Sequence, residues 1–98
     1  MKSASRLDKE AAEMLAIQAL GFIAEEPQRL AAFLSSSGLA IEQVRDAAAE
    51  SSFPVGVLEH MLGDESLLLA FAASAGVDPA AIEQARAALA RERNRRLP

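Results

Sequence analysis

The stretch Leu30-Ala31-Ala32-Phe33, followed by Gly38-Leu39, recurs as Leu68-Leu69-Ala70-Phe71, followed by Gly76-Val77. Both parts recur at the same offset of 38 in residue number, so the phenylalanine and the glycine keep the same spacing in each copy. A constant offset is typical of domains assembled from related supersecondary units. Each copy reads as a helix that ends at a glycine turn and is followed by a second helix. The sequence therefore predicts an all-α fold: a compact bundle of five to six short helices with two helix-turn-helix-like repeats.

Length and composition indicate one small domain. A chain of 98 residues is long enough for a single hydrophobic core and too short for two. Hydrophobic residues make up 51% of the chain and aromatic residues only 4%, so alanine and the aliphatic residues supply most of the apolar surface. Alanine favours helices and lets their axes approach closely. We predict a single helical domain over residues 1–90 and a basic, frayed C-terminal tail over residues 91–98.

Three features of the sequence favour a cytoplasmic location. Cysteine is absent, which excludes disulfides and thiolate chemistry. Charged residues interrupt the start of the chain, where a signal peptide needs an apolar segment. The longest apolar run, from Leu67 to Ala73, is far shorter than the about 18 residues that span a bilayer. We expect a cytoplasmic protein without a membrane partner.

Start and stop signals place three helices in the first half. The first is expected from about Ser5 to Ala24, and its apolar arc is wide enough for a central position. The second begins at Pro27 and ends at Gly38, where a left-handed cap fits. The third has a weak start, because Ala40 stands where a capping side chain belongs. The apolar arc of the first helix is expected to include Leu7, Ala11, Met14, Leu15, Gln18 and Phe22, widened by Ile17, Leu20 and Ile23.

The second half carries clearer signals. A fourth helix begins at Pro54 and ends at Gly63, and Asp64 caps a fifth that ends at Gly76. Asp78 followed by Pro79 is a strong start for a sixth helix, which continues into the arginine-rich end of the chain.

One detail of the alignment between the two copies is ambiguous. Ile41-Glu42-Gln43 recurs as Ile82-Glu83-Gln84 at an offset of 41, but the ungapped offset of 38 keeps the apolar residues in phase with the glycine turn, and we prefer it.

Three segments resemble a known family. They are residues 30–38, residues 53–62, and the segment DESLLLAFA at residues 64–72 with its downstream Gly76 and Pro79. Together they are similar to the small bacterial family known as domain of unknown function 3572. The resemblance covers nearly the whole chain except the arginine tail. It implies a compact helical protein and no established activity, so it assigns no functional residues.

The second glycine turn also resembles the DNA-binding helix-turn-helix, because Phe71-Ala72, Gly76 and Ile82 follow its spacing. Reading DNA requires basic or polar side chains on the outer face of the second helix. That face is neutral to acidic here, and the net charge of the chain is −4. We therefore do not expect sequence-specific DNA binding. The outward residues are Pro79, Ala80, Ala81, Glu83 and Gln84 in the second copy, and Glu42, Gln43, Arg45 and Asp46 in the first.

The arginine tail has two interpretations. Arg91, Arg93, Arg95 and Arg96 are candidates for contact with an anionic partner. Cations in the last turn of a helix also complement the helix dipole, and Glu92 is spaced to pair with Arg96. We prefer the second interpretation, a solvated helix end.

The titratable residues do not form a catalytic pattern. His60 is the only histidine, and one imidazole supplies a single bond where zinc needs three or four. We expect it to be a partly buried packing residue. The acidic pairs Glu25-Glu26 and Asp64-Glu65 lie at helix N-termini, where capping explains them. The sequence has no phosphate-binding loop or nucleophile elbow, so we assign no catalytic, metal or cofactor residues and expect no enzymatic activity.

The remaining candidate site is a run of leucines. Leu68 matches Leu30, but Leu67 and Leu69 replace Arg29 and Ala31. Three consecutive residues spread over about 200° of a helix, so either another helix covers Leu67 and Leu69 or a partner does. Leu69 lies on the flank further from the core face. These leucines favour a non-enzymatic adaptor or regulatory domain that binds an unidentified protein or itself; the alternative is a nucleic-acid-associated protein that uses its arginine tail.

Overall fold

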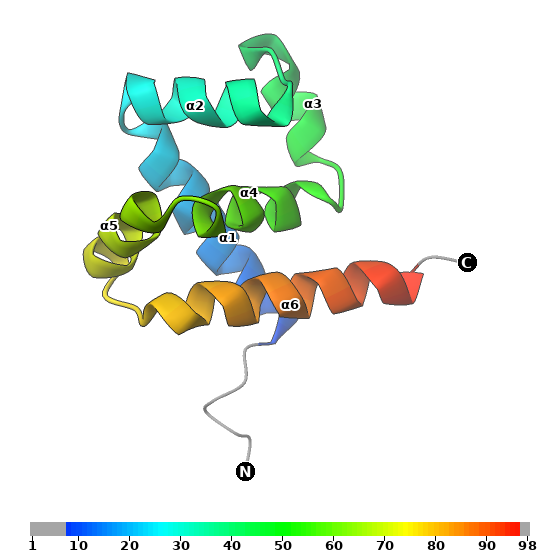
Figure 1. The fold of residues 1–98 in the computed structure, drawn as a ribbon. Helices are drawn as coiled ribbons and strands as arrows, with labels where there is room; N and C mark the ends of the chain where they lie inside the picture. Colours follow the sequence, from blue (N-terminus) through cyan, green and yellow to red (C-terminus); the bar gives the residue numbers. More distant parts are fainter. Residues whose placement is uncertain (1–7, 97–98) are drawn as a thin grey trace.

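The computed structural model describes the backbone of residues 8–96 and the side chains of residues 8–94. That part of the chain is helical and contains no strand (Figure 1). The elements are α1 (Lys9–Ala24), α2 (Pro27–Ser37), the 3-10 turn η1 (Ile41–Gln43), α3 (Val44–Ala48), α4 (Phe53–Leu62), α5 (Glu65–Ala75) and α6 (Pro79–Arg96). The predicted all-α class, with six helices, is confirmed.

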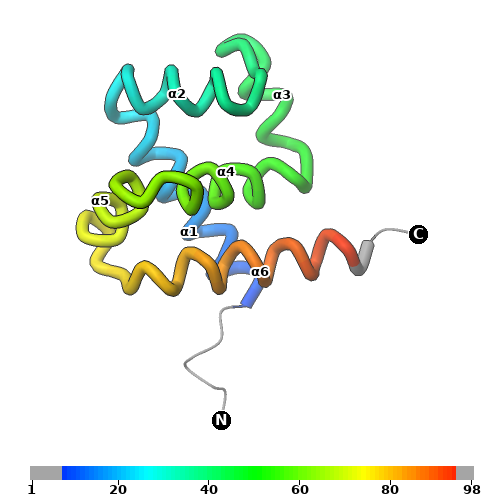
Figure 2. Tube along the Cα trace, in the orientation of Figure 1, coloured from blue at the N-terminus to red at the C-terminus, as the bar shows by residue number. Residues whose placement is uncertain are grey.

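The helix α1 lies at the centre of the fold, as its wide apolar arc predicted. It packs against α2, α4, α5 and α6, and Figure 2 shows it passing behind α4. It begins at Lys9, where the Asp8 carboxylate accepts a hydrogen bond of 2.8 Å from the Ala11 amide. The start expected near Ser5 falls in residues that the structure does not describe. Within the described range, Asp8 is an extended cap and not part of the helix.

The predicted buried face of α1 was partly wrong. Leu15 and Phe22 are buried as expected, but Ala11, Met14 and Gln18 are exposed. Because α1 is apolar around most of its circumference, periodicity alone could not select the face. Small side chains on the buried face let two long helices approach closely. That face consists of Ala12, Leu15, Ala16, Ala19, Phe22 and Ile23.

Two equivalent glycine turns organise the rest of the chain. Gly38 ends α2 with a φ of 74°, and Gly76 ends α5 with a φ of 71°. Each turn is closed by the same type of hydrogen bond, in which the amide after the glycine donates to a carbonyl in the last turn of the helix. The donor–acceptor distances are 3.1 Å from Leu39 to Leu34 and 3.0 Å from Val77 to Ala72. The left-handed cap predicted at Gly38 is confirmed, and Gly76, predicted as a helix end, has the same conformation.

The boundaries of the elements follow the same offset of 38 in residue number. The range Pro27–Ser37 of α2 matches Glu65–Ala75 of α5, and the last residue of α1, Ala24, matches the last residue of α4, Leu62. After the glycine turns, the next elements begin at Ile41 and Pro79, again at this offset. These starts agree with the ungapped alignment.

Aromatic contacts between the two halves are reciprocal. The rings of Phe22 on α1 and Phe71 on α5 lie 5.5 Å apart. The rings of Phe33 on α2 and His60 on α4 lie 5.2 Å apart, edge to face. Each half thus presents a ring from its first helix to the second helix of the other, as two units do across a two-fold axis. Phe33 and Phe71 are both buried, as the sequence predicted.

The helices after the glycine turns differ. The Asp78 carboxylate accepts from the Ala80 amide at 2.8 Å, and α6 then runs along α1 and α4. In the first half only the Gln43 side chain satisfies the Ala40 amide, and the predicted weak start takes the form of the 3-10 turn. No side chain of η1 or α3 is buried. The core is therefore closed by a long helix on one side only. The buried residues of α6 are Ile82, Ala85, Ala88 and Leu89.

Candidate functional site

The two leucines predicted to bind a partner lie in different environments. Leu67 is partly buried and packs against the core, whereas 49% of the Leu69 surface is exposed. Arg29, which occupies the position of Leu67 in the first half, also covers the core. Its guanidinium lies 4.0 Å from the centre of the Phe22 ring and donates to the Phe22 carbonyl at 3.2 Å. Leu69 is thus available for a contact, and Leu67 takes part in the packing.

The arginine tail lies apart from the leucines. Arg91 and Arg93 are exposed on the last turns of α6, and the side chains of Arg95 and Arg96 are outside the described part. Figure 1 shows α6 running away from α5 toward the C-terminus. The fold therefore does not combine the two predicted surfaces into one site.

The backbone around the second glycine turn, at Gly76, resembles that of a DNA-binding helix-turn-helix. The helices α5 and α6 are bent by 101° relative to each other, an angle seen in such motifs. On the outer face, the guanidinium of Arg86 donates to both carboxylate oxygens of Glu83, at 2.9 and 2.7 Å. These hydrogen bonds lower the pKa of Glu83 and raise that of Arg86. The Arg86 charge is paired with Glu83, which leaves this face neutral to acidic, as the sequence predicted.

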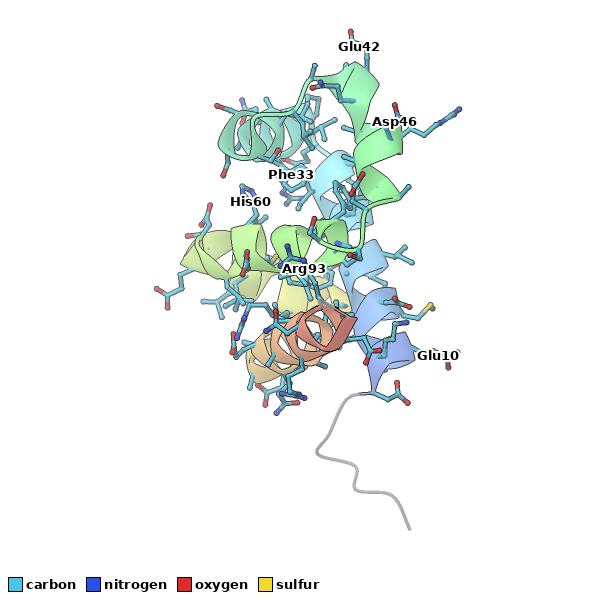
Figure 3. The ribbon with its side chains drawn as sticks, turned by 90° about the vertical axis from the view of Figure 1, so that its right-hand side faces the viewer. Glu10, Phe33, Glu42, Asp46, His60 and Arg93 are labelled. Carbon is cyan, nitrogen blue, oxygen red and sulfur yellow. The ribbon has the colours of Figure 1, made fainter. Side chains whose placement is uncertain are left out.

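A cavity lies between α2, the end of α3 and α4, and no pattern in the sequence indicated it. Its volume is about 470 Å³. Phe33 meets Phe53 edge to face at 6.1 Å and His60 at 5.2 Å, so three rings form one wall. The remaining lining residues are Ser36, Ser37, Leu39, Ala47, Glu50, Ser52, Gly56 and Glu59. Figure 3 shows Phe33 and His60 facing each other between α2 and α4.

Chemistry in this cavity is limited by the contacts that its side chains already make. His60 is partly buried against Phe33, which confirms the packing position predicted for it. The Ser37 hydroxyl donates to the Phe33 carbonyl at 2.8 Å and not to the imidazole. Within residues 8–94, no group of three histidine or acidic side chains could hold a metal ion. The cavity is therefore lined by aromatic rings, serines and carboxylates that do not form a catalytic or metal-binding group within the described residues.

A second hollow, which we call the α1–α4 groove, is apolar. Its volume is about 220 Å³. Ile17 is 66% exposed at its edge, and Met14, one turn earlier on α1, is 59% exposed. Sequence reasoning assigned both residues to the core face of the first helix and so missed the groove. The lining residues are Glu13, Ala16, Ile17 and Leu20 of α1, Ala48 of α3, and Phe53, Pro54 and Val57 of α4.

No single helix in the described part is long and apolar enough to cross a membrane. The pair α5 and α6 reaches that length and composition only together, across the 101° bend.

The fold and the groove define a small all-α domain in which two helical segments share one core. The chain belongs to the family described as protein of unknown function, DUF3572, which matches residues 9–92. The match extends from the first residue of α1 to Glu92 in α6, so the resemblance found in the sequence is confirmed. No curated protein and no solved structure matches the chain significantly.

Proposed function

We propose that this protein is a non-enzymatic helical domain that acts by binding another protein, as an adaptor or regulator. The observation that carries the proposal is the α1–α4 groove, where the aliphatic side chain of Ile17 is two-thirds exposed beside an apolar hollow. Burying such surface contributes about 25 cal/mol per Å². Grouped exposed apolar residues are typical of interaction sites in small domains.

The exposed position of Leu69 on α5 supports a second contact region. Met14, Ile17, Ile41 and Leu69 are the large hydrophobic residues with about half or more of their surface exposed in the described part. Met14 and Ile17 lie on successive turns of α1 and share one flank of the helix. Leu69 lies on α5, which contacts α1 through the Phe22 and Phe71 rings.

The proposal is tested by affinity purification from the native cell with five forms of the protein: wild type, Ile17→Glu, Leu69→Glu, and the control variants Gln18→Glu and Ala73→Glu at neighbouring exposed positions. Leu69→Glu should change the free energy of unfolding by no more than about 0.5 kcal/mol, as substitutions at exposed positions do. We expect a partner to be retained by wild type and both controls and lost with Ile17→Glu or Leu69→Glu.

The proposal would be contradicted if all five forms of the protein retained the same set of proteins. A second measurement addresses nucleic acid directly. Micromolar binding to duplex DNA or structured RNA that weakens steeply with salt would replace the protein-binding proposal by the alternative, because such a slope reports contacts to phosphates.

A further inference from the structure

The α1–α4 groove is the counterpart of the surface that α6 covers. The offset of 38 in residue number pairs Ile17 with Val55 and Leu20 with Leu58. Val55 and Leu58 lie on α4, which packs against α6, and they are 8% and 0% exposed. Their counterparts on α1 have no long helix over them, because α3 ends after five residues. The first half of the molecule therefore presents the surface on which the second half carries a helix.

The helix α6 shows what fits such a surface. It presents Ile82, Ala85, Ala88 and Leu89 to the core, so its buried residues are aliphatic or small and are spaced three or four residues apart, with Ala88 next to Leu89. This spacing places at least one buried residue on each successive turn. An occupant of the α1–α4 groove that follows the same geometry is an amphipathic helix with one narrow apolar stripe.

The charges around the groove determine the polar face of that helix. Glu13 lines the groove, and Glu10 lies one turn earlier on α1. Glu42 and Asp46 belong to η1 and α3, and Figure 3 shows them toward the opposite end of the molecule from Glu10. Within α1, η1 and α3 the bases are Lys9 and Arg45, and the acids are Glu10, Glu13, Glu42 and Asp46. Glu13 also lines a neighbouring hollow with Lys9 and with Arg93 of α6, and the acids remain in excess when Arg93 is counted.

We propose that the α1–α4 groove binds an amphipathic helix of a partner protein whose apolar stripe has the spacing of α6 and whose flanks carry lysine or arginine. This inference rests on the proposed function and specifies its partner. Apolar contact with Ile17 supplies affinity, and the acidic margin selects basic over acidic helices.

The test uses the 98-residue chain and fluorescein-labelled synthetic peptides of 18 residues, the length of α6. The basic peptide has leucine or alanine at the stripe positions and lysine or arginine at the flanks. An acidic peptide replaces each lysine and arginine by glutamate, and a third peptide has the basic composition in scrambled order. Fluorescence anisotropy measures the dissociation constant of each peptide at low and high salt.

We expect saturable binding of the basic peptide, weaker by at least about tenfold with Ile17→Glu, since it places a charge in the centre of the contact. Glu13→Arg should weaken binding and reduce its salt dependence, because it removes one partner of the basic flanks. Gln18→Glu and Ala73→Glu, at exposed positions outside the groove, should leave binding unchanged. Circular dichroism of each variant establishes that the fold is retained.

Four results would overturn the inference: no binding of the basic peptide, equal binding of the acidic or scrambled peptide, binding that Ile17→Glu does not change, or a wild-type dimer that Ile17→Glu converts to a monomer. The last result would assign the groove to a second copy of this chain. The experiments distinguish failure of this inference from failure of the proposed protein-binding function. A native partner that depends on Ile17 while the basic peptide does not bind would retain the proposed function and reject the basic helix.

Discussion

The helices α3 and α6 come after equivalent glycine turns, yet α3 has five residues with none buried and α6 has 18 and closes the core. The turns themselves are the same, because Gly38 and Gly76 adopt nearly the same φ. The difference lies in the residues after each turn. Asp78 caps α6, whereas Ala40 offers no side-chain acceptor. A glycine turn thus redirects the chain but does not decide whether the next helix enters the core.

The residues on the third turn of α6, and those at the corresponding positions after α3, show the second cause of the difference. In α6, Ala88 and Leu89 are buried. The offset of 38 places Glu50 and Ser51 at the corresponding positions after α3. Polar residues there gain nothing from burial, so the helix ends and the α1–α4 groove stays open.

The largest effect should come from the phenylalanines that are equivalent in both halves. Phe33→Ala and Phe71→Ala should each lower the free energy of unfolding by about 3 to 5 kcal/mol, because each removes a buried ring and leaves a cavity. Urea denaturation followed by circular dichroism measures both losses. If Phe33→Ala cost less than about 1 kcal/mol while Phe71→Ala cost the full amount, the two halves would not share one core.

The difference between α3 and α6 is tested by shortening one side chain in each. Ile82 is fully buried in α6, and its counterpart Val44 is only partly buried in α3. Ile82→Ala should cost about 3 kcal/mol, and Val44→Ala below about 1 kcal/mol. Equal losses in thermal or chemical unfolding would show that α3 is as tightly integrated as α6.

Because the two glycine turns are equivalent, replacing either glycine should cause an equal and moderate loss of stability. Gly38→Ala and Gly76→Ala should each cost about 1 kcal/mol, because a Cβ disfavours the left-handed conformation. An added Cβ would meet no atom within 4 Å at either position, so backbone strain is the whole cost. Unequal losses in the melting temperature would show that the turns differ in ways that φ does not reveal.

The smallest effect concerns the Glu83 and Arg86 pair on the outer face of α6. Hydrogen bonds from Arg86 lower the pKa of Glu83 relative to its unfolded value of about 4.3. The pair therefore stabilises the fold above that pH, and the contribution is lost as the pH falls through the lowered pKa. Arg86→Gln should raise the Glu83 pKa measured by NMR and change stability at neutral pH by less than about 1 kcal/mol. An unchanged pKa would contradict the pairing.

Local signals predicted the elements of this fold well. Pro27, Pro54, Asp64 and Asp78 marked helix starts, and the two left-handed glycines marked helix ends. These signals act through backbone geometry and hydrogen bonds within a few residues, so they can be read without knowledge of the fold. The burial of Phe33 and Phe71 also followed from the offset between the two halves.

The candidate site was harder to predict because it depends on what covers each face. Met14 and Ile17 have the same helical spacing as core residues, and only the placement of α4 and α6 leaves them exposed. The cavity beside Phe33 and His60 likewise forms between helices that are distant in sequence. Leu69 was identified because its position breaks the match between the two halves, a signal that the sequence does contain.

The sequence by itself determined the all-α class, the positions of the glycine turns and caps, and the membership of the family, because each depends on short-range order along the chain. The tertiary structure decided which face of α1 is buried, and that α6 closes one side of the core while the α1–α4 groove stays open on the other. The physical reason is that a side chain is buried only where a second surface packs against it. The sequence of a helix that is apolar on all sides, such as α1, does not indicate which face a neighbouring helix will cover.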